Sequence, residues 1–345
     1  MYPRAVIRES SVAALLWLAL CAVYVGLGVF GVGSGLWGVA PYIAALTIAR
    51  ATEPRPGLRR GLRTAAVAGA TGAIVVGVAV GIGREHVLGA GSGDTARLVT
   101  VAAFSLAAAG ILTLACAVRP VRQRLFPRVG LDPASAVHAT AAVLYATTLV
   151  VMAGSFVLLY DDPGETIPIY LSDPVVSLLT DVPLALAGVG WLMTRNFSMA
   201  LGRLGFVPIT RRQVAWAGVV AAAFVVAAGL LDHVEAWLLP EIYEREGRFS
   251  LKFANVSPWL GAPLVAVAAG VGEEAVFRGA MQPRFGVPLT ALLFAAVHVQ
   301  YEIPGIILIF LIGVVLGVLR DRTSTTFTAL AHMLYDIAAF LIPDA

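Results

Sequence analysis

The feature that most constrains this chain is a series of long apolar segments, joined by connections that carry most of its charged residues. Hydrophobic residues make up 59% of the sequence and charged residues only 13%. A run of about 20 apolar residues can cross a bilayer as an α-helix, because each residue adds about 1.5 Å of length. We therefore expect an all-α, polytopic transmembrane helix bundle of about eleven spans, at residues 11–32, 35–50, 64–83, 98–118, 136–160, 175–194, 214–232, 258–280, 286–301, 304–319 and 325–342.

The distribution of basic residues predicts the orientation of these spans. With the N-terminus in the cytoplasm, nineteen of the 24 Lys and Arg residues fall on the cytoplasmic side and five fall outside. This asymmetry follows the positive-inside rule and predicts an N-in, C-out topology. The short ninth segment could instead be re-entrant, but that alternative would place Arg320 and Arg322 outside.

The organisation along the chain predicts a scaffold followed by a functional domain. Residues 1–210, with about six helices, carry few polar groups at membrane depth, whereas residues 211–345 carry most of them. His138 and Asp181 have no partner at helical spacing, so we expect structural roles for both. The abundance of Ala, Gly, Val and Arg beside the single Lys252 suggests a prokaryotic plasma membrane. A net charge of +3 gives no indication of a nucleic-acid partner.

Six ionisable residues in the last four predicted spans are the candidate functional residues. A charged side chain at the centre of a membrane helix costs about 2.5–3.5 kcal/mol even on mild insertion scales, so such residues are functional candidates. The six are Glu273, Glu274, Arg278, His298, His332 and Asp336.

Their spacing predicts which of them face one another. Glu274 and Arg278 lie four residues apart, on one helix face, and can neutralise each other, while Glu273 points about 100° away. His332 and Asp336 share a face in the same way. The depths also agree, at roughly 10 Å for Glu273, 11 Å for His332, and 17 Å for His298 and Asp336 from the cytoplasmic helix ends.

A carboxylate and two imidazoles that meet inside a membrane can bind and deprotonate a water molecule, with or without a metal. This chemistry indicates hydrolysis. A buried ion-pair network that only holds the bundle together is the structural alternative.

The same residues resemble the motifs of the CPBP family, the CAAX protease and bacteriocin-processing intramembrane proteases related to type II CAAX prenyl endopeptidases. The motifs are EEAVFR at 273–278, FAAVH at 294–298 and HMLYD at 332–336. The resemblance implies that Glu273 and His298 activate water and that Glu274 and Arg278 support them. It also implies that His332 and Asp336 stabilise the oxyanion or hold a metal.

The donor types also predict a metal cofactor. Glu273, His298, His332 and Asp336 supply the oxygen and nitrogen donors that Zn²⁺ accepts, so we expect a divalent metal, most simply zinc. Asp336 stands where the prenyl endopeptidases have asparagine, and an aspartate suits a metal-ligand or His332-orienting role.

The expected activity is cleavage of a membrane-associated peptide or protein near the cytoplasmic leaflet. A prenylated CAAX peptide is one candidate substrate, and a bacteriocin-like peptide is another. Two alternatives stay open, a proton-coupled secondary transporter and a catalytically inactive scaffold or immunity protein on the same fold.

Overall fold

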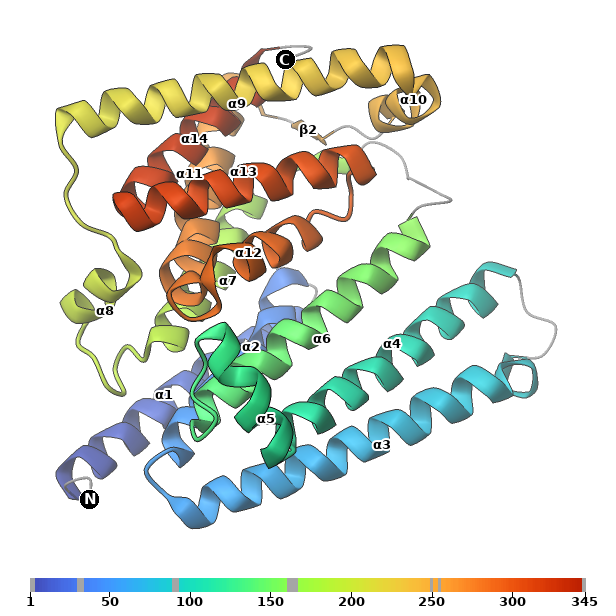
Figure 1. Cartoon of the computed structure of the whole chain (residues 1–345), viewed down its shortest axis with the longest axis vertical. Coiled ribbons are helices and arrows are strands. Elements are labelled where there is room, and N and C mark those ends of the chain that lie inside the picture. Colours follow the sequence, from blue (N-terminus) through green and yellow to red (C-terminus); the bar gives the residue numbers. More distant parts are fainter. Residues whose placement is uncertain are drawn as a thin grey trace. The chain divides into compact units, whose positions relative to one another are not determined.

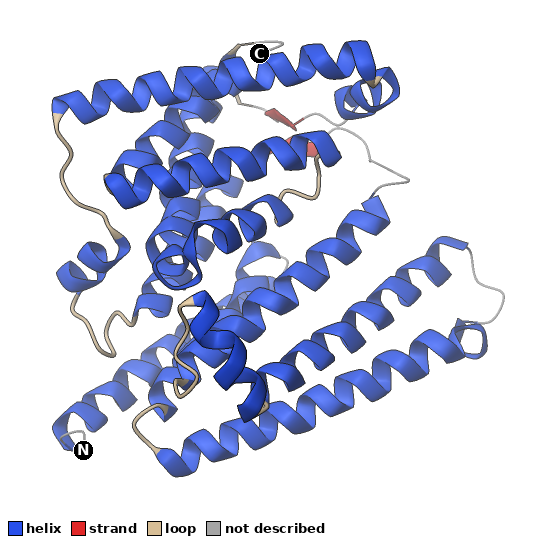
Figure 2. Ribbon diagram, viewed as in Figure 1, coloured by secondary structure: helices blue, strands red, loops and turns tan. Residues whose placement is uncertain are grey.

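The computed structural model describes residues 4–29, 34–88, 93–159, 167–248, 251–253 and 256–342. Helices form almost all of this described part (Figure 2). Every predicted apolar segment overlaps a helix, which confirms the all-α polytopic bundle. The long helices are α1 (Arg4–Val29), α2 (Ser34–Thr52), α3 (Pro56–Leu88), α4 (Gly93–Ala117), α6 (Ala136–Leu159), α7 (Ser172–Val189), α9 (Arg211–Leu238), α11 (Pro258–Glu274), α12 (Gln282–Ala296), α13 (Ile303–Arg322) and α14 (Thr325–Leu341) (Figure 1).

Within the described residues, eight helical stretches are long and apolar enough to cross a membrane. Pro258–Ala296 counts as one of them, although it contains the eighth predicted segment and most of the ninth. Only 11% of the apolar window in Pro56–Ile82 is buried inside the protein. Lipid chains cover such a surface at no hydrophobic cost, so the chain is an integral, multi-pass membrane protein. The number eleven and the orientation of the spans stay predictions.

Short elements that the apolar pattern does not mark join the long helices. They are α5 (Arg119–Leu125), the 3₁₀-helix η1 (Phe126–Val129), α8 (Phe197–Leu204), α10 (Pro240–Arg248) and the π-helix η2 (Ala275–Met281). Two three-residue strands, β1 (Ile167–Ile169) and β2 (Leu251–Phe253), pair in parallel, with Pro168 opposite Lys252.

Side-chain caps explain where three of the helices begin. Asn196 accepts a hydrogen bond from the backbone N–H of Met199 at the start of α8. Thr210 and Gln213 form a capping box at the start of α9, and Ser324 caps α14. These side chains satisfy backbone N–H groups that the first helical turn leaves free.

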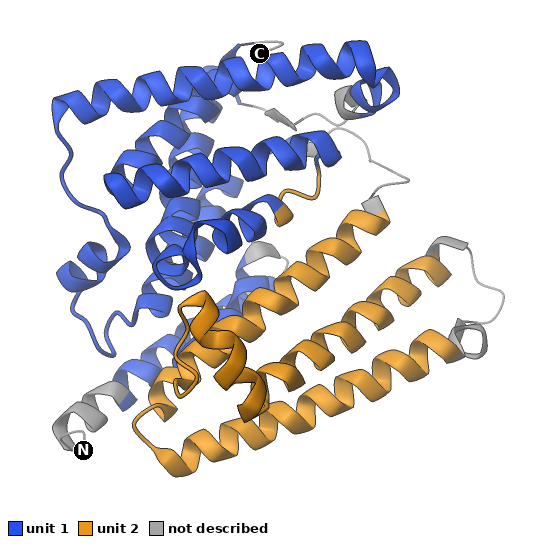
Figure 3. Cartoon of the chain, viewed as in Figure 1, with its two compact units in different colours: residues 1–47, 164–295, 301–345 blue, residues 48–163, 296–300 orange. Residues whose placement is uncertain are grey.

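Two compact units make up the chain (Figure 3). Unit 1 contains residues 1–47, 164–295 and 301–345, and unit 2 contains residues 48–163 and 296–300. Because α1, α7 and α8 belong to unit 1, these units do not follow the predicted boundary between 1–210 and 211–345. The functional boundary therefore stays a prediction.

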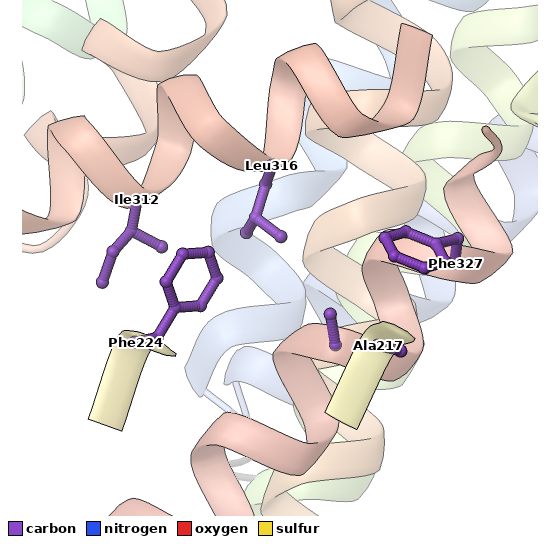
Figure 4. Packing of buried hydrophobic residues seen from close by; sticks show 6 residues of the cluster. Ala217, Phe224, Ile312, Leu316 and Phe327 are labelled. Atoms are coloured by element: carbon purple, nitrogen blue, oxygen red, sulfur yellow. The ribbon is translucent and has the colours of Figure 1, made fainter. Parts of the chain in front are cut away.

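The apolar core of unit 1 joins α9, α13 and α14 (Figure 4). Ala217 and Phe224 of α9 pack with Leu316 of α13 and Phe327 of α14. Phe224 also meets the ring of Tyr335 edge to face, at 6.0 Å between centroids. This packing supports α14, the helix that carries two of the candidate residues.

Glycines allow close helix contacts in both units. In unit 2, a Cβ on Gly110 of α4 would lie 2.7 Å from the Ala70 carbonyl oxygen of α3. In unit 1, a Cβ on Gly317 of α13 would lie 2.8 Å from Val287. Neither position has room for a side chain. Such close packing at small residues is typical of membrane helices.

The predicted orientation can be tested by cysteine labelling in a variant with Cys21 and Cys116 replaced by alanine. A cysteine at the exposed Thr323 is expected to react with an impermeant maleimide only from the cytoplasmic side. A cysteine at the exposed Glu241 is expected to react only from the outer side. The reverse pattern would overturn the N-in topology.

Candidate active site

The candidate active site is built on the junction between α11 and the π-helix η2. Glu273 and Glu274 are the last two residues of α11, and Arg278 lies inside η2. A π-helical turn is rare and occurs frequently at functional sites. Gly270 brings α14 against this junction, because a Cβ there would lie 2.8 Å from the Ala329 carbonyl oxygen.

Glu274 is the centre of a closed polar cluster. Its Oε1 lies 3.3 Å from Nη1 of Arg278 and 3.3 Å from Nδ1 of His332. Glu274 is 0% exposed and Arg278 is 1% exposed. The predicted pairing of Glu274 with Arg278 is therefore present, and the buried carboxylate also faces His332, a contact that helical spacing cannot reveal.

Phe294 of α12 covers this cluster from one side. The guanidinium of Arg278 stacks over its ring at 4.2 Å from the centroid. The same ring meets His332 edge to face, with centroids 6.0 Å apart. A cation over an aromatic face is favourable and excludes water, so Phe294 helps to hold the charge of Arg278 inside the bundle.

Glu273 has a different environment from Glu274. Its side chain is half-buried rather than enclosed, and its Oε2 has no hydrogen-bond partner in the described part of the chain. Its charge lies within electrostatic range of Arg278, His332 and Asp336. Oε2 of Glu274 also lacks a partner among the described residues, so the two glutamates differ in exposure and in the ion pairs that only Glu274 makes.

Asp181, on helix α7, approaches Glu273. The sequence assigns no catalytic role to this helix. Its Oδ2 would lie 2.9 Å from a Cβ on Gly272, and its charge interacts with that of Glu273. The hydroxyl of Ser177 donates a hydrogen bond to it at 3.3 Å. The sequence places Asp181 at membrane depth. It does not reveal the approach to Glu273, because Glu273 lies on a helix about ninety residues later.

His332 lies between two carboxylates. Nδ1 faces Glu274 at 3.3 Å and Nε2 lies 3.6 Å from Oδ1 of Asp336, which confirms the predicted proximity of His332 and Asp336. The second distance is longer than a hydrogen bond. Nε2 and Asp336 therefore lie close together without a hydrogen bond between them.

His298 does not lie on the helix that the sequence predicts for it. Helix α12 ends at Ala296, and His298 lies in the connection to α13, which begins at Ile303 with Pro304 in its first turn. Helical spacing therefore does not decide whether Phe294 and His298 lie together. Because residues 296–300 group with unit 2, the membership of His298 in the site stays a prediction.

The predicted zinc ligands do not form a metal site among the described residues. No group of three His, Cys, Asp or Glu side chains there is arranged to hold a metal ion. His332 points Nδ1 at Glu274, which already pairs with Arg278, rather than at Glu273. This arrangement does not fit the predicted ligand set, and we derive no reaction step through a metal.

Zinc dependence remains testable as a prediction from the sequence. If zinc is required, we expect peptide hydrolysis to fall to background after exhaustive chelation and to return with stoichiometric Zn²⁺. A zinc-bound water would lose its proton near pH 7 and become a nucleophile. Removal of the zinc would therefore remove the nucleophile and stop hydrolysis. Full activity in protein shown by elemental analysis to be metal-free would refute it.

Replacement of Gly272 by alanine tests the contact between α7 and α11. The new methyl group would collide with Asp181, so we expect a loss of about 1–3 kcal/mol in unfolding free energy together with lower turnover. Gly218→Ala in α9 is the matched control, because a Cβ there has no neighbour within 4 Å. Thermal unfolding in detergent measures both, and equal melting temperatures would contradict the contact.

Gln282 is a further buried polar residue that the sequence interpretation missed. Its Nε2 donates hydrogen bonds of 2.8 Å to the Gly317 carbonyl and to Oδ1 of Asp321. It follows Arg278 by four residues, and this spacing is the signal that could have identified it. Gln282 ties the start of α12 to the end of α13.

Comparison with known proteins identifies the segment that carries the cluster. Residues 255–338 match the family model of the Rce1-like type II CAAX prenyl endopeptidases. An uncharacterized protein of Bacillus subtilis (strain 168), YpbD, is 26% identical over 127 residues, which cover 36% of this chain and 66% of YpbD. No solved structure matches the chain. Residues 255–338, with Glu273, Glu274, Arg278, His332 and Asp336, are therefore similar to the Rce1-like endopeptidases, which confirms the resemblance to the CPBP family of intramembrane proteases.

Proposed function

We propose that this protein is an intramembrane endopeptidase that uses Glu273 to activate water. The observation that carries the proposal is the contrast between two adjacent glutamates in the Rce1-like domain. Glu274 is enclosed with Arg278 and His332, whereas Glu273 is half-buried beside them. The enclosed cluster stabilises the site, and the half-buried carboxylate of Glu273 performs the chemistry.

Glu273 acts as the general base in this proposal. It accepts a proton from water as the water oxygen bonds to the peptide carbonyl carbon, and the carbonyl oxygen gains negative charge. His332, through an N–H at Nε2, stabilises that oxygen, and Glu274, which faces Nδ1, orients the ring. The C–N bond then breaks as Glu273 passes the proton to the leaving amine.

The expected substrate is a peptide or protein held at the membrane. The predicted orientation puts the Glu273 end of α11 in the cytoplasmic half of a prokaryotic plasma membrane. The family model points to prenylated CAAX peptides as one substrate class. A membrane-associated peptide without a prenyl group, such as a bacteriocin precursor, is accommodated by the same chemistry.

Comparative proteomics of membranes tests the proposal on the substrates that the cell itself supplies. Cells that carry Glu273→Gln are expected to accumulate uncleaved precursors that cells with the unchanged protein process. Asp232→Asn is the matched control, since Asp232 is another acid of unit 1, on α9. Identical peptide termini in the Glu273→Gln and unchanged membranes would point to a transporter or an inactive scaffold instead.

A further inference from the structure

Four arginines gather at the ends of the unit 1 elements around α8 and η2. We call Arg195, Arg203, Arg284 and Arg320 the arginine cluster. Arg203, on α8, is within electrostatic range of the other three. They come from the turn after α7, from α8, from the start of α12 and from the end of α13.

The arginine cluster holds more positive charge than its acidic neighbours neutralise. Asp321 pairs with Arg320 at 3.2 Å, but the guanidinium groups of Arg195 and Arg203 donate to the carbonyls of Val189 and Gly279. Partial burial, and then the charges of Arg284, Arg195 and Arg320, lower the pKa of Arg203 to about 10. Arg203 still carries its proton at neutral pH, so the cluster repels itself and favours an anionic ligand.

The surface beside the arginine cluster is apolar. On α8, Phe197 is 52% exposed and Met199 is 55% exposed, and the nearby Leu192 and Val207 are also exposed. Helix α8 is too short to cross a membrane, and it combines exposed apolar residues with Arg203. That combination is typical of a segment that lies in the headgroup region of a bilayer.

Helix α8 contacts both halves of the candidate active site. Arg203 donates a 2.9 Å hydrogen bond to the carbonyl of Gly279, in the π-helix that holds Arg278. A Cβ on Gly279 would lie 2.8 Å from the Leu204 carbonyl, so the two elements are in tight contact.

On its other side, the same segment is attached to the start of α14. The hydroxyl of Thr325 donates a 2.6 Å hydrogen bond to the Leu204 carbonyl. The hydroxyl of Thr326 bonds with both the N–H and the carbonyl of Val207. The segment from α8 to Val207 therefore joins η2, with Arg278, to α14, with His332.

We propose that the arginine cluster binds the phosphate headgroup of an anionic phospholipid in the cytoplasmic leaflet, with Phe197 and Met199 against its acyl chains. The bound phosphate offsets part of the positive charge of the arginine cluster and stabilises the contacts of α8 with η2 and α14. An anionic lipid fits better than a soluble anion because charge and exposed apolar surface lie side by side on α8. The effect on catalysis rests on the proposed endopeptidase function, whereas lipid binding does not.

The binding experiment uses the full-length protein and phosphatidylglycerol as the probe. Native mass spectrometry counts retained lipids during titration, and the melting temperature is measured in nanodiscs of phosphatidylcholine with and without phosphatidylglycerol. We expect phosphatidylglycerol to raise the melting temperature. Arg203→Gln/Arg284→Gln is expected to bind the lipid about 30-fold more weakly, from about fivefold per arginine.

Controls separate this site from general charge attraction. Arg211→Gln/Arg212→Gln removes two exposed charges from the start of α9 and is expected to bind like the unchanged protein. Arg284→Gln alone tests the exposed arginine without removal of the Arg203 hydrogen bond and is expected to weaken binding about fivefold. Equal losses in the Arg211/Arg212 and Arg203/Arg284 variants would overturn the proposal.

Two further arms test the lipid source and the link to activity. Inorganic phosphate alone is expected to leave the melting temperature unchanged, and equal stabilisation by phosphate would overturn the assignment to a lipid. Phosphatidylglycerol is expected to raise the rate of precursor cleavage in the unchanged protein but not in Arg203→Gln/Arg284→Gln. If the unchanged protein cleaves no precursor, the endopeptidase proposal fails, while the binding arms still decide the lipid site.

Discussion

Replacement of Glu274 by alanine is expected to lower the unfolding free energy by about 3–5 kcal/mol, because it leaves the buried charge of Arg278 without its partner. Arg278 is 1% exposed, so water cannot solvate it in the folded protein. Phe294 over the guanidinium recovers only part of that loss. Chemical or thermal unfolding of the detergent-solubilised protein measures the effect.

A double variant separates the lost pair from the lost side chain. Replacement of Glu274 by glutamine together with Arg278 by methionine removes both charges while it keeps most of the volume, and buried pairs replaced in this way often lose little stability. The double variant is therefore expected to be more stable than Glu274→Ala. A double variant that is less stable than Glu274→Ala would show that the pair itself is not the source of the effect.

Glu273→Gln is expected to lower kcat by about 10²–10⁴-fold, the usual contribution of a general base, with little change in stability. Glutamine keeps the shape of the side chain but cannot take a proton from water. Glu273 is half-buried and outside the closed Glu274 cluster, so its neutralisation leaves Arg278 and His332 paired. Kinetics on a precursor found by proteomics, with a melting curve for each variant, measures both.

The comparison of the two adjacent positions is the decisive part of this prediction. If Glu273→Gln and Glu274→Ala lower the melting temperature equally, the two glutamates do not divide structural and chemical roles. If Glu273→Gln keeps kcat within a few-fold of the unchanged protein, another group activates the water.

The length of the apolar runs was sufficient to predict the long helices. The apolar segments at 98–118 and 136–160, for example, became α4 and α6 with ends within a few residues. In lipid, the backbone N–H and C=O groups of a spanning segment must form hydrogen bonds within the protein. A long apolar run satisfies all of them by itself only as an α-helix. The short α8 and the π-helix η2 escaped prediction because neighbouring elements hold them in place.

Local spacing predicted the pairs within one helix. Glu274 with Arg278, and His332 with Asp336, are four residues apart, and a helical turn brings such side chains together whatever surrounds them. The same rule does not apply to Phe294 and His298, because the helix ends at Ala296 before the second residue is reached.

Sequence alone therefore established the membrane helices, the ionisable residues within them and the pairs that one helix can form. Only the tertiary structure placed His332 against Glu274, Phe294 over Arg278, and Asp181 beside Gly272. Each of these contacts joins two helices, and its geometry depends on how closely those helices pack. Glycines such as Gly270 and Gly272 allow the short distance between helices, because they have no side chain to hold the neighbouring helix away. The distance between two helices leaves no repeating pattern in the sequence, so the sequence alone does not reveal it.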